Sequence, residues 1–172
     1  PDEVVALVNI GAAVTNINIL RGEISDFTRD SPLGGNRHTE SLQKSLGLSF
    51  EQAEVLKRGE PVEGHSVADA MPVVEMANSE LAGEIRRSFD FYYSTSQSDT
   101  IHRVVLSGGC ALLSGLAASL SSTLKLPVEV ANPFQHIVVD PKKFDPQYLA
   151  FIAPQMTVAV GLALREPEDD VA

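Results

Sequence analysis

The sequence predicts an α/β domain built on a mixed β-sheet. Two observations support this class. The first three strand candidates follow one another with only short turns between them, which predicts an antiparallel meander. The later strand candidates alternate with segments of helical period, as they do in α/β folds.

The strands are predicted from short apolar runs. Residues 4–8 are apolar throughout, which indicates a central strand. Residues 14–20 and 23–28 are joined at Arg21-Gly22, a short hairpin signal. Two further strands are expected at residues 101–106 and 127–130.

The helices are predicted from their period and from their end signals. Ser49 can cap a helix, and Gln52 completes a capping box with it. Pro72 suits the first turn of the longest helix, expected at residues 71–96. The remaining helices are expected at residues 39–46, 112–124 and 155–164, with loops at residues 62–70 and over most of 135–155.

Composition excludes several classes of protein. The 172 residues carry a net charge of −10, so we expect neither a general nucleic-acid binder nor direct adsorption to anionic lipid. No apolar run reaches the roughly 18 residues of a membrane-spanning helix, and we expect no direct membrane insertion. Cys110 is the one cysteine, so the chain can form no internal disulfide, which fits a reducing compartment.

Two glycine turns are candidate ligand sites. Gly11 follows the first strand, and Gly108-Gly109 follow the strand at residues 101–106. Ligands of open α/β sheets bind beyond the carboxyl ends of strands, where backbone N–H groups can hold a phosphate. Taken alone, either turn is more often a plain connection. Asn9 stands where an acidic residue would serve a metal ion better.

Few other side chains suggest a catalytic or ligand-binding role. Glu54 and Lys57 lie three apart on one helix face, and on spacing alone they form a solvated ion pair. His38 is expected in a turn, and no pair of histidines has metal-ligand spacing. Cys110 is expected to be a small buried side chain. We therefore predict no catalytic residue and no metal-ligating cluster.

Four motifs in order resemble one known family. They are NIGAAVTNINILRG, LGGNRHTESLQKSLGLSFEQAEVLKRG, VVLSGGCALLSGLAASLSSTLKLPVEVANPF and APQMTVAVGLALR, and they span nearly the whole chain. Together they resemble the second half of the actin-like ATPases of the PilM family, which serve type IV pilus assembly. The family is similar to FtsA and, more distantly, to Hsp70-type chaperones and sugar kinases. The stretch LPVEVANPF favours PilM over FtsA.

The resemblance implies an organisation and a site. Residues 1–33 and 72–172 would form a ribonuclease-H-like lobe, residues 34–71 a small helical insertion, and the N-terminal half of the parent protein would be absent. ATP, with Mg²⁺, would lie in a cleft between two lobes and would need that missing half. The residues matching the family's nucleotide site are Asn9, Gly11, Ala12, Ala13 and Thr15 on the phosphate side, with Gly108, Gly109, Glu54 and Lys57 on the adenosine side.

The chain departs from the family pattern at Asn9, where aspartate is usual. A neutral amide holds magnesium-bound water weakly, so hydrolysis is less expected than binding, and at most a weak ATPase is expected in the full-length protein.

The resemblance also implies partners. These are a PilN-like inner-membrane protein and the pilus assembly ATPases, with self-association possible. The expected location is the cytoplasm, peripheral to the inner membrane through those partners.

Three alternatives remain open from the sequence. One is an FtsA-like filament protein, although the acidic ending GLALREPEDDVA does not match that protein's membrane-binding helix. Another is an ATP-dependent phosphotransferase, for which no substrate base is visible. The last is an α/β domain with no nucleotide site.

Overall fold

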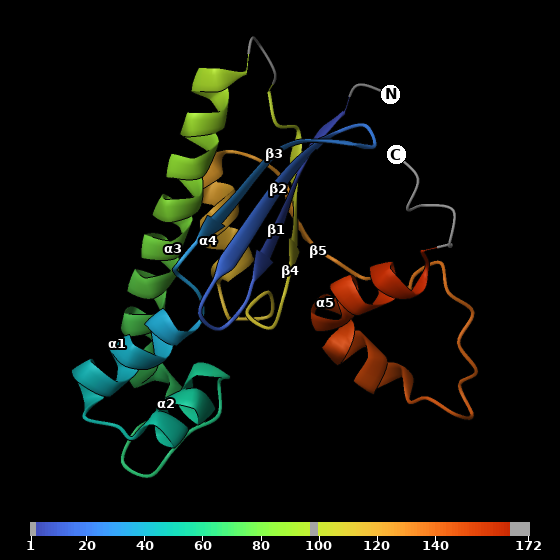
Figure 1. Cartoon of the computed structure of the whole chain (residues 1–172). Helices are drawn as coiled ribbons and strands as arrows, with labels where there is room; N and C mark the ends of the chain where they lie inside the picture. The colour runs from blue at the N-terminus through green and yellow to red at the C-terminus, as the bar shows by residue number, and fades with distance from the viewer. Residues whose placement is uncertain (1–2, 97–99, 166–172) are drawn as a thin grey trace.

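The computed structural model describes residues 3–96 and 100–165. It confirms the predicted fold class, because a five-stranded mixed sheet with the order β3-β2-β1-β4-β5 is flanked by helices (Figure 1). β1 (Val4–Ile10), β2 (Thr15–Arg21) and β3 (Ile24–Ser31) form the antiparallel meander. β4 (Arg103–Ser107) and β5 (Val128–Val130) join it in parallel.

The main core lies between the sheet and two helices, α3 (Val67–Thr95) and α4 (Leu116–Leu124). Alternate side chains of β1 point into it, and Ala6, Val8 and Ile10 are fully buried. A row of α3 side chains at i, i+4 spacing is also buried: Ala77, Leu81, Ile85 and Phe89.

A second hydrophobic cluster joins α1 (Asn36–Leu46) and α2 (Phe50–Lys57) to the first turns of α3. Leu42, Leu56 and Val74 represent its three helices. The predicted capping box of α2 is present, because Ser49 and Gln52 bond each other's backbone N–H groups. α3 contributes to both clusters, so the exact limits of the insertion at residues 34 and 71 stay a prediction.

Four helix starts were predicted wrongly, and the first of them is that of α1, which begins at Asn36 instead of residue 39. α3 begins at Val67 because Ser66 and Asp69 form a capping box inside the segment expected to be a loop, so Pro72 lies in the helix interior. α4 begins at Leu116, after Gly115 at a φ of 73°. α5 (Pro146–Ala163) begins before residue 155 because Asp145 caps it and Pro146 occupies its first turn.

Two further expectations concern the surface. Among the helices of residues 3–96 and 100–165, none has the length and apolarity to cross a membrane. The acidic ending after Arg165 lies outside the described residues.

Candidate functional site at the carboxyl ends of β1 and β4

The two predicted glycine turns lie side by side. β1 and β4 are parallel neighbours in which Asn9 pairs with Ser107, so both strands end at the same edge of the sheet. The turns also touch, because the N–H of Cys110 donates to the carbonyl of Ile10 at 3.2 Å. Residues almost 100 positions apart thus meet at one place.

The turn after β1 presents free backbone amides. The N–H of Gly11 donates to the carbonyl of Val14 at 2.9 Å and closes the turn. Ala12 and Ala13 are exposed, and within the described part of the chain their N–H groups have no hydrogen-bond partner. Adjacent amides of this kind can hold an anion.

Thr15 supports this turn from inside. Its hydroxyl donates to the carbonyl of Leu33 at 2.7 Å, and the residue is fully buried. In this arrangement the Thr15 side chain fixes the base of the turn, while Ala12 and Ala13 are exposed.

Gly34 and Gly35 form a tight junction against the same turn. The N–H of Gly35 donates to the carbonyl of Gly11 at 2.9 Å, and that of Asn36 to the carbonyl of Ala12 at 2.7 Å. A Cβ on Gly34 would lie 2.5 Å from the carbonyl oxygen of Gly11, closer than real Cβ atoms approach. The junction therefore requires glycine and ties the start of α1 to the turn.

Asn9 belongs to a polar row across the sheet. Its Oδ1 accepts from the Ser107 hydroxyl at 3.3 Å, and its Nδ2 donates to Oδ1 of Asn16 at 3.1 Å. Asn16 in turn donates to Asp30 at 2.8 Å. The row crosses β4, β1, β2 and β3, so the Asn9 amide is held by neighbours on both sides.

The two glycines after β4 have different environments. Gly108 has a φ of 92°, and a Cβ there would lie 2.3 Å from the carbonyl oxygen of Ile10, so the fold requires glycine. Gly109 is exposed, and a Cβ on it would meet no atom of the described chain within 4 Å. Neither packing nor backbone conformation explains Gly109, which leaves an open surface where another molecule can approach the backbone.

Lys57 and Glu54 approach this edge from α2, but not as the solvated pair that spacing alone suggested. The Lys57 ammonium is largely buried and lies 2.5 Å from a Glu54 carboxylate oxygen. It also donates to the Thr39 hydroxyl at 2.9 Å and to the Gly35 carbonyl at 3.4 Å. The Thr39 hydroxyl donates to Glu54, so Thr39 is a member of the network that sequence reasoning missed.

This network decides the charge of Glu54. Burial raises the pKa of the carboxyl, but hydrogen bonds from Lys57 and Thr39 outweigh burial and hold it below the usual value of 4.5. Glu54 is therefore charged at neutral pH, and the network links α2 to the Gly34-Gly35 junction.

A cavity of about 140 Å³ opens beside Lys57. It is bounded by the end of α2, the first turns of α3 and the turn before α4, and most of its lining is apolar. The lining residues that face one another from these elements include Lys57, Gly59, Ala70, Val74, Ser114 and Gly115. α4 begins only at Leu116. The turn around Ser114 and Gly115 therefore lines this cavity, and the N-terminus of α4 does not.

A buried polar link holds that turn in place. Nδ2 of Asn78 donates to the Ser114 carbonyl at 2.9 Å, and its Oδ1 lies 2.8 Å from Nε2 of His38. Since the amide oxygen can only accept, Nε2 carries the proton and Nδ1 does not. Nδ1 is buried without a partner among the described residues.

His38 was predicted in a turn, but it lies on α1 and is fully buried. Burial lowers the pKa of the imidazole below its usual value of 6.5. In the sequence, the i, i+4 spacing of His38 to Leu42, which is buried, was the pattern that could have indicated a helical, buried His38.

Cys110 is buried as predicted, and its Sγ lies 3.4 Å from the carbonyl oxygen of Gly11. Burial raises the pKa of this thiol. Within the described residues no three histidine, cysteine or acidic side chains converge as metal ligands would. Together the free amides, the open glycine, a buried cation and an apolar cavity suit an anion joined to a flat, largely apolar group.

The sequence matches, over residues 1–167, the family described as type IV pilus assembly protein PilM. Among solved structures, the chain is similar to the PilM-PilN type IV pilus biogenesis complex at 35% identity and a TM-score of 0.84. That alignment covers 97% of this chain and 47% of the matched chain.

More distant matches show the fold alone. The ethanolamine utilization protein EutJ from Carboxydothermus hydrogenoformans is 24% identical with a TM-score of 0.66, over 95% of this chain and 49% of that chain. MreB5 of Spiroplasma citri, solved with ADP, is 14% identical with a TM-score of 0.68, over 98% and 54%. The chain thus spans about half the length of each matched protein. These likenesses confirm the actin-like fold, and the family match over almost the whole sequence shows that this chain belongs to the type IV pilus assembly protein PilM family.

Proposed function

We propose that this chain forms one half of an actin-like ATP-binding scaffold of type IV pilus assembly. The observation that carries the proposal is the meeting of two open backbone surfaces at one sheet edge. The free amides of Ala12 and Ala13 lie on one turn, and the unexplained glycine Gly109 lies on the neighbouring turn. Membership of the PilM family supports the proposal that this edge binds a nucleotide.

ATP fits the available groups in one orientation. The free amides of Ala12 and Ala13 would bind the β- and γ-phosphates, and Gly11 would close the turn that presents them. Gly109 leaves its backbone open for the ribose, and the cavity beside Lys57 is apolar enough for adenine. Thr15, Gly108 and Glu54 would then hold these surfaces in position through the contacts described above.

Mg²⁺ and hydrolysis are a separate matter. The end of β1 supplies the Asn9 amide in place of a carboxylate, and that amide is engaged by Ser107 and Asn16. This half of the site therefore offers Mg²⁺ no anionic ligand at the end of β1, so we infer that ATP is held longer than it is hydrolysed. ATP occupancy would then act by setting the arrangement of lobes in the longer protein.

The partners follow from the family. A solved PilM is in complex with PilN, and we infer that the longer form of this protein docks a PilN-like inner-membrane protein. It would be a cytoplasmic protein recruited to the inner membrane through that partner, where it would also meet the pilus assembly ATPases. Nucleotide state would influence this docking by changing how the lobes are arranged.

The test measures ATP binding by the longer polypeptide that contains this sequence. Gly109→Trp should weaken binding at least about tenfold, or 1.4 kcal/mol, because the indole would fill the open surface beside the backbone. Met76→Trp is the matched control, because Met76 is an exposed residue of α3 outside the site. Equal affinities for Gly109→Trp and the native protein would show that the adenosine side is assigned wrongly.

Turnover is measured in the same protein with Asn9→Asp. The carboxylate should raise the rate of ATP hydrolysis in the presence of Mg²⁺. A native rate equal to that of Asn9→Asp would refute the inference that Asn9 slows hydrolysis.

A further inference from the structure

The polar row that contains Asn9 follows the pairing of the strands. In the register of the sheet, Asn9 pairs with Ser107 on β4 and with Asn16 on β2, and Asn16 pairs with Asp30 on β3. The four side chains thus stand opposite one another on adjacent strands, the arrangement in which cross-strand pairs interact. Since β3 is an edge strand, Asp30 is the outer end of the row.

This outer end fixes the direction of every hydrogen bond in the row. The carboxylate of Asp30 can accept hydrogen bonds but cannot donate one. Asn16 must therefore turn its Nδ2 toward Asp30, at 2.8 Å, which leaves its Oδ1 facing Asn9. Because that oxygen also only accepts, Asn9 must present its own Nδ2, at 3.1 Å, and turn its Oδ1 toward the Ser107 hydroxyl, which donates at 3.3 Å. One carboxylate on the edge strand thus orients both amides.

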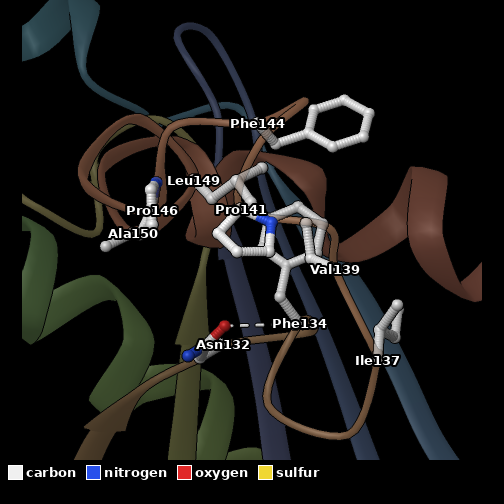
Figure 2. Close-up of a pocket in the computed structure, with 9 residues that line it drawn as sticks. All are labelled: Asn132, Phe134, Ile137, Val139, Pro141, Phe144, Pro146, Leu149 and Ala150. Carbon is white, nitrogen blue, oxygen red and sulfur yellow. Dashed lines mark hydrogen bonds between the residues drawn. The ribbon is translucent and has the colours of Figure 1, made fainter.

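The inner end of the row is Ser107. The amide that follows β5, Asn132, is engaged elsewhere, because its Oδ1 accepts from the N–H of Phe134 at 3.1 Å within its own turn (Figure 2). The hydrogen bonds of the row therefore run one way, from Ser107 on β4 to Asp30 on β3.

An ionised acid at position 9 does not fit this row. Its carboxylate would face Oδ1 of Asn16, so two acceptors would meet without a proton between them. If Asn16 turned over to donate to position 9, its Oδ1 would face the carboxylate of Asp30, and the same conflict would arise one strand further out. One such contact remains in either orientation. The row therefore accepts an amide at position 9 and opposes a carboxylate.

We propose that Asp30, acting through Asn16, is the positioning residue that keeps position 9 an amide. The row then places its one carboxylate on β3, two strands away from β1 and the turn that follows it. The consequence for Mg²⁺ and hydrolysis rests on the proposed function, whereas the selection of an amide by the row does not.

Exchanging the two acidic and amide positions should rebuild the row in the opposite direction. In the double variant Asn9→Asp/Asp30→Asn, the new carboxylate can accept from Nδ2 of Asn16, and the new amide at position 30 can donate to its Oδ1. Ser107 can donate to position 9 as before. The double variant also keeps the native net charge of −10.

The first test measures the thermal midpoint of the 172-residue chain. At pH 7, Asn9→Asp should lower the midpoint by about 2–4 °C, and adding Asp30→Asn should recover most of that loss. Asn18→Asp is the matched control, because Asn18 is half-buried like Asn9 and its Oδ1 only accepts, from the Ser25 hydroxyl at 2.7 Å. A carboxylate keeps that bond, so Asn18→Asp should lower the midpoint less. Any gain from Asp30→Asn beside Asn18→Asp measures the general effect of removing a negative charge.

The pH dependence separates the row from simple packing. A protonated carboxyl has an O–H that can donate to Oδ1 of Asn16, as the native amide does. The ionised form is opposed in the folded chain, so folding should raise the pKa of the carboxyl introduced by Asn9→Asp above its unfolded value of about 3.9. The stability that the protonated form contributes is then lost as pH rises through the folded pKa. The midpoint deficit against the native protein should therefore be smallest near about pH 4 and should grow toward pH 7.

Two results would overturn the proposal. One is a deficit of Asn9→Asp that is the same at pH 4 and pH 7. The other is a recovery on adding Asp30→Asn that is no larger for Asn9→Asp than for Asn18→Asp.

The second test measures ATP turnover by the longer polypeptide with Mg²⁺. Asn9→Asp/Asp30→Asn should turn over ATP at least about threefold faster than Asn9→Asp, because the carboxylate is then held by a donor and no longer faces an acceptor. Equal rates would overturn the role of Asp30 in hydrolysis. A longer polypeptide that binds no ATP would refute the proposed function, while the midpoints of the 172-residue chain would still decide whether the row selects an amide.

Discussion

The turn after β1 and the turn after β4 lie at the same sheet edge but are stabilised differently. The first is held from outside, because Gly35 and Asn36 bond its carbonyls and Gly34 packs against them. The second is held from within, because Gly108 adopts a positive φ and contacts Ile10 directly. In both turns the residues that the fold requires are buried against backbone, while Ala12, Ala13 and Gly109 face outward.

The two turns show two different reasons for a glycine at this edge of the sheet. Gly34 and Gly108 are explained by the distance to neighbouring backbone atoms. Gly109 has no such neighbour, so its explanation must come from outside the described chain. The comparison therefore predicts that the same substitution will destabilise the protein strongly at Gly108 and hardly at all at Gly109.

Gly108→Ala should have the largest effect. A non-glycine residue at positive φ costs about 1–3 kcal/mol, and forcing a methyl group into packed backbone costs about 1–3 kcal/mol more. We expect the free energy of unfolding to fall by roughly 3–5 kcal/mol, measured by urea denaturation. A loss below about 1 kcal/mol would show that the turn after β4 relaxes easily, and the contrast between the turns would disappear.

Gly34→Ala should have the next largest effect. Gly34 has no positive φ, so only the clash with the Gly11 and Ala12 carbonyls acts, and overpacking of this kind costs about 1–3 kcal/mol. The clash should also displace the amides of Ala12 and Ala13. Hydrogen exchange at those two amides would measure the displacement, and unchanged exchange and stability would argue against a tight junction.

The stability of the protein near pH 6 tests the hydrogen-bonded link that runs from His38 through Asn78 to the Ser114 carbonyl. Burial lowers the pKa of His38, so the unfolded chain binds this proton more readily than the folded chain. The free energy of unfolding should therefore decrease as pH falls below about 6.5, through the folded pKa. His38→Gln should flatten this decrease, and His136→Gln, in an exposed loop, should not. If the free energy of unfolding depends on pH equally in the native protein and in His38→Gln, His38 is not the cause of the decrease.

Gly109→Ala should change stability least, by no more than about 0.5 kcal/mol, because the methyl group meets no atom of the described chain. It is the matched partner of Gly108→Ala, one residue away. A large loss of stability in Gly109→Ala would mean that structure, and not a ligand, explains this glycine.

Much of the sheet could be predicted because its signals are local. The apolar run of β1 indicated a central strand, and the glycines at residues 11 and 108–109 marked the two turns that meet at one edge of the sheet. The capping box of α2 was visible for the same reason, since Ser49 and Gln52 are three residues apart.

The missed features depend on competing local signals or on distant partners. Pro72 was taken as the mark of a helix start, and the last helix was expected only from residue 155, but α3 and α5 begin at better caps upstream. Thr39 and His38 gain their roles from Lys57 and Asn78, which come from other helices. No periodicity in one segment reveals such contacts.

The hydrogen bonds of the two turns also set an order of assembly during synthesis. The turn after β1 has all its backbone partners once residue 36 has left the ribosome. The turn after β4 needs Ile10 from the start of the chain and Pro154 from near its end. Since contacts between distant segments form slowly and domains fold as their chain emerges, the turn after β1 can form early in translation. The surface beside it is completed only after most of the chain has been made.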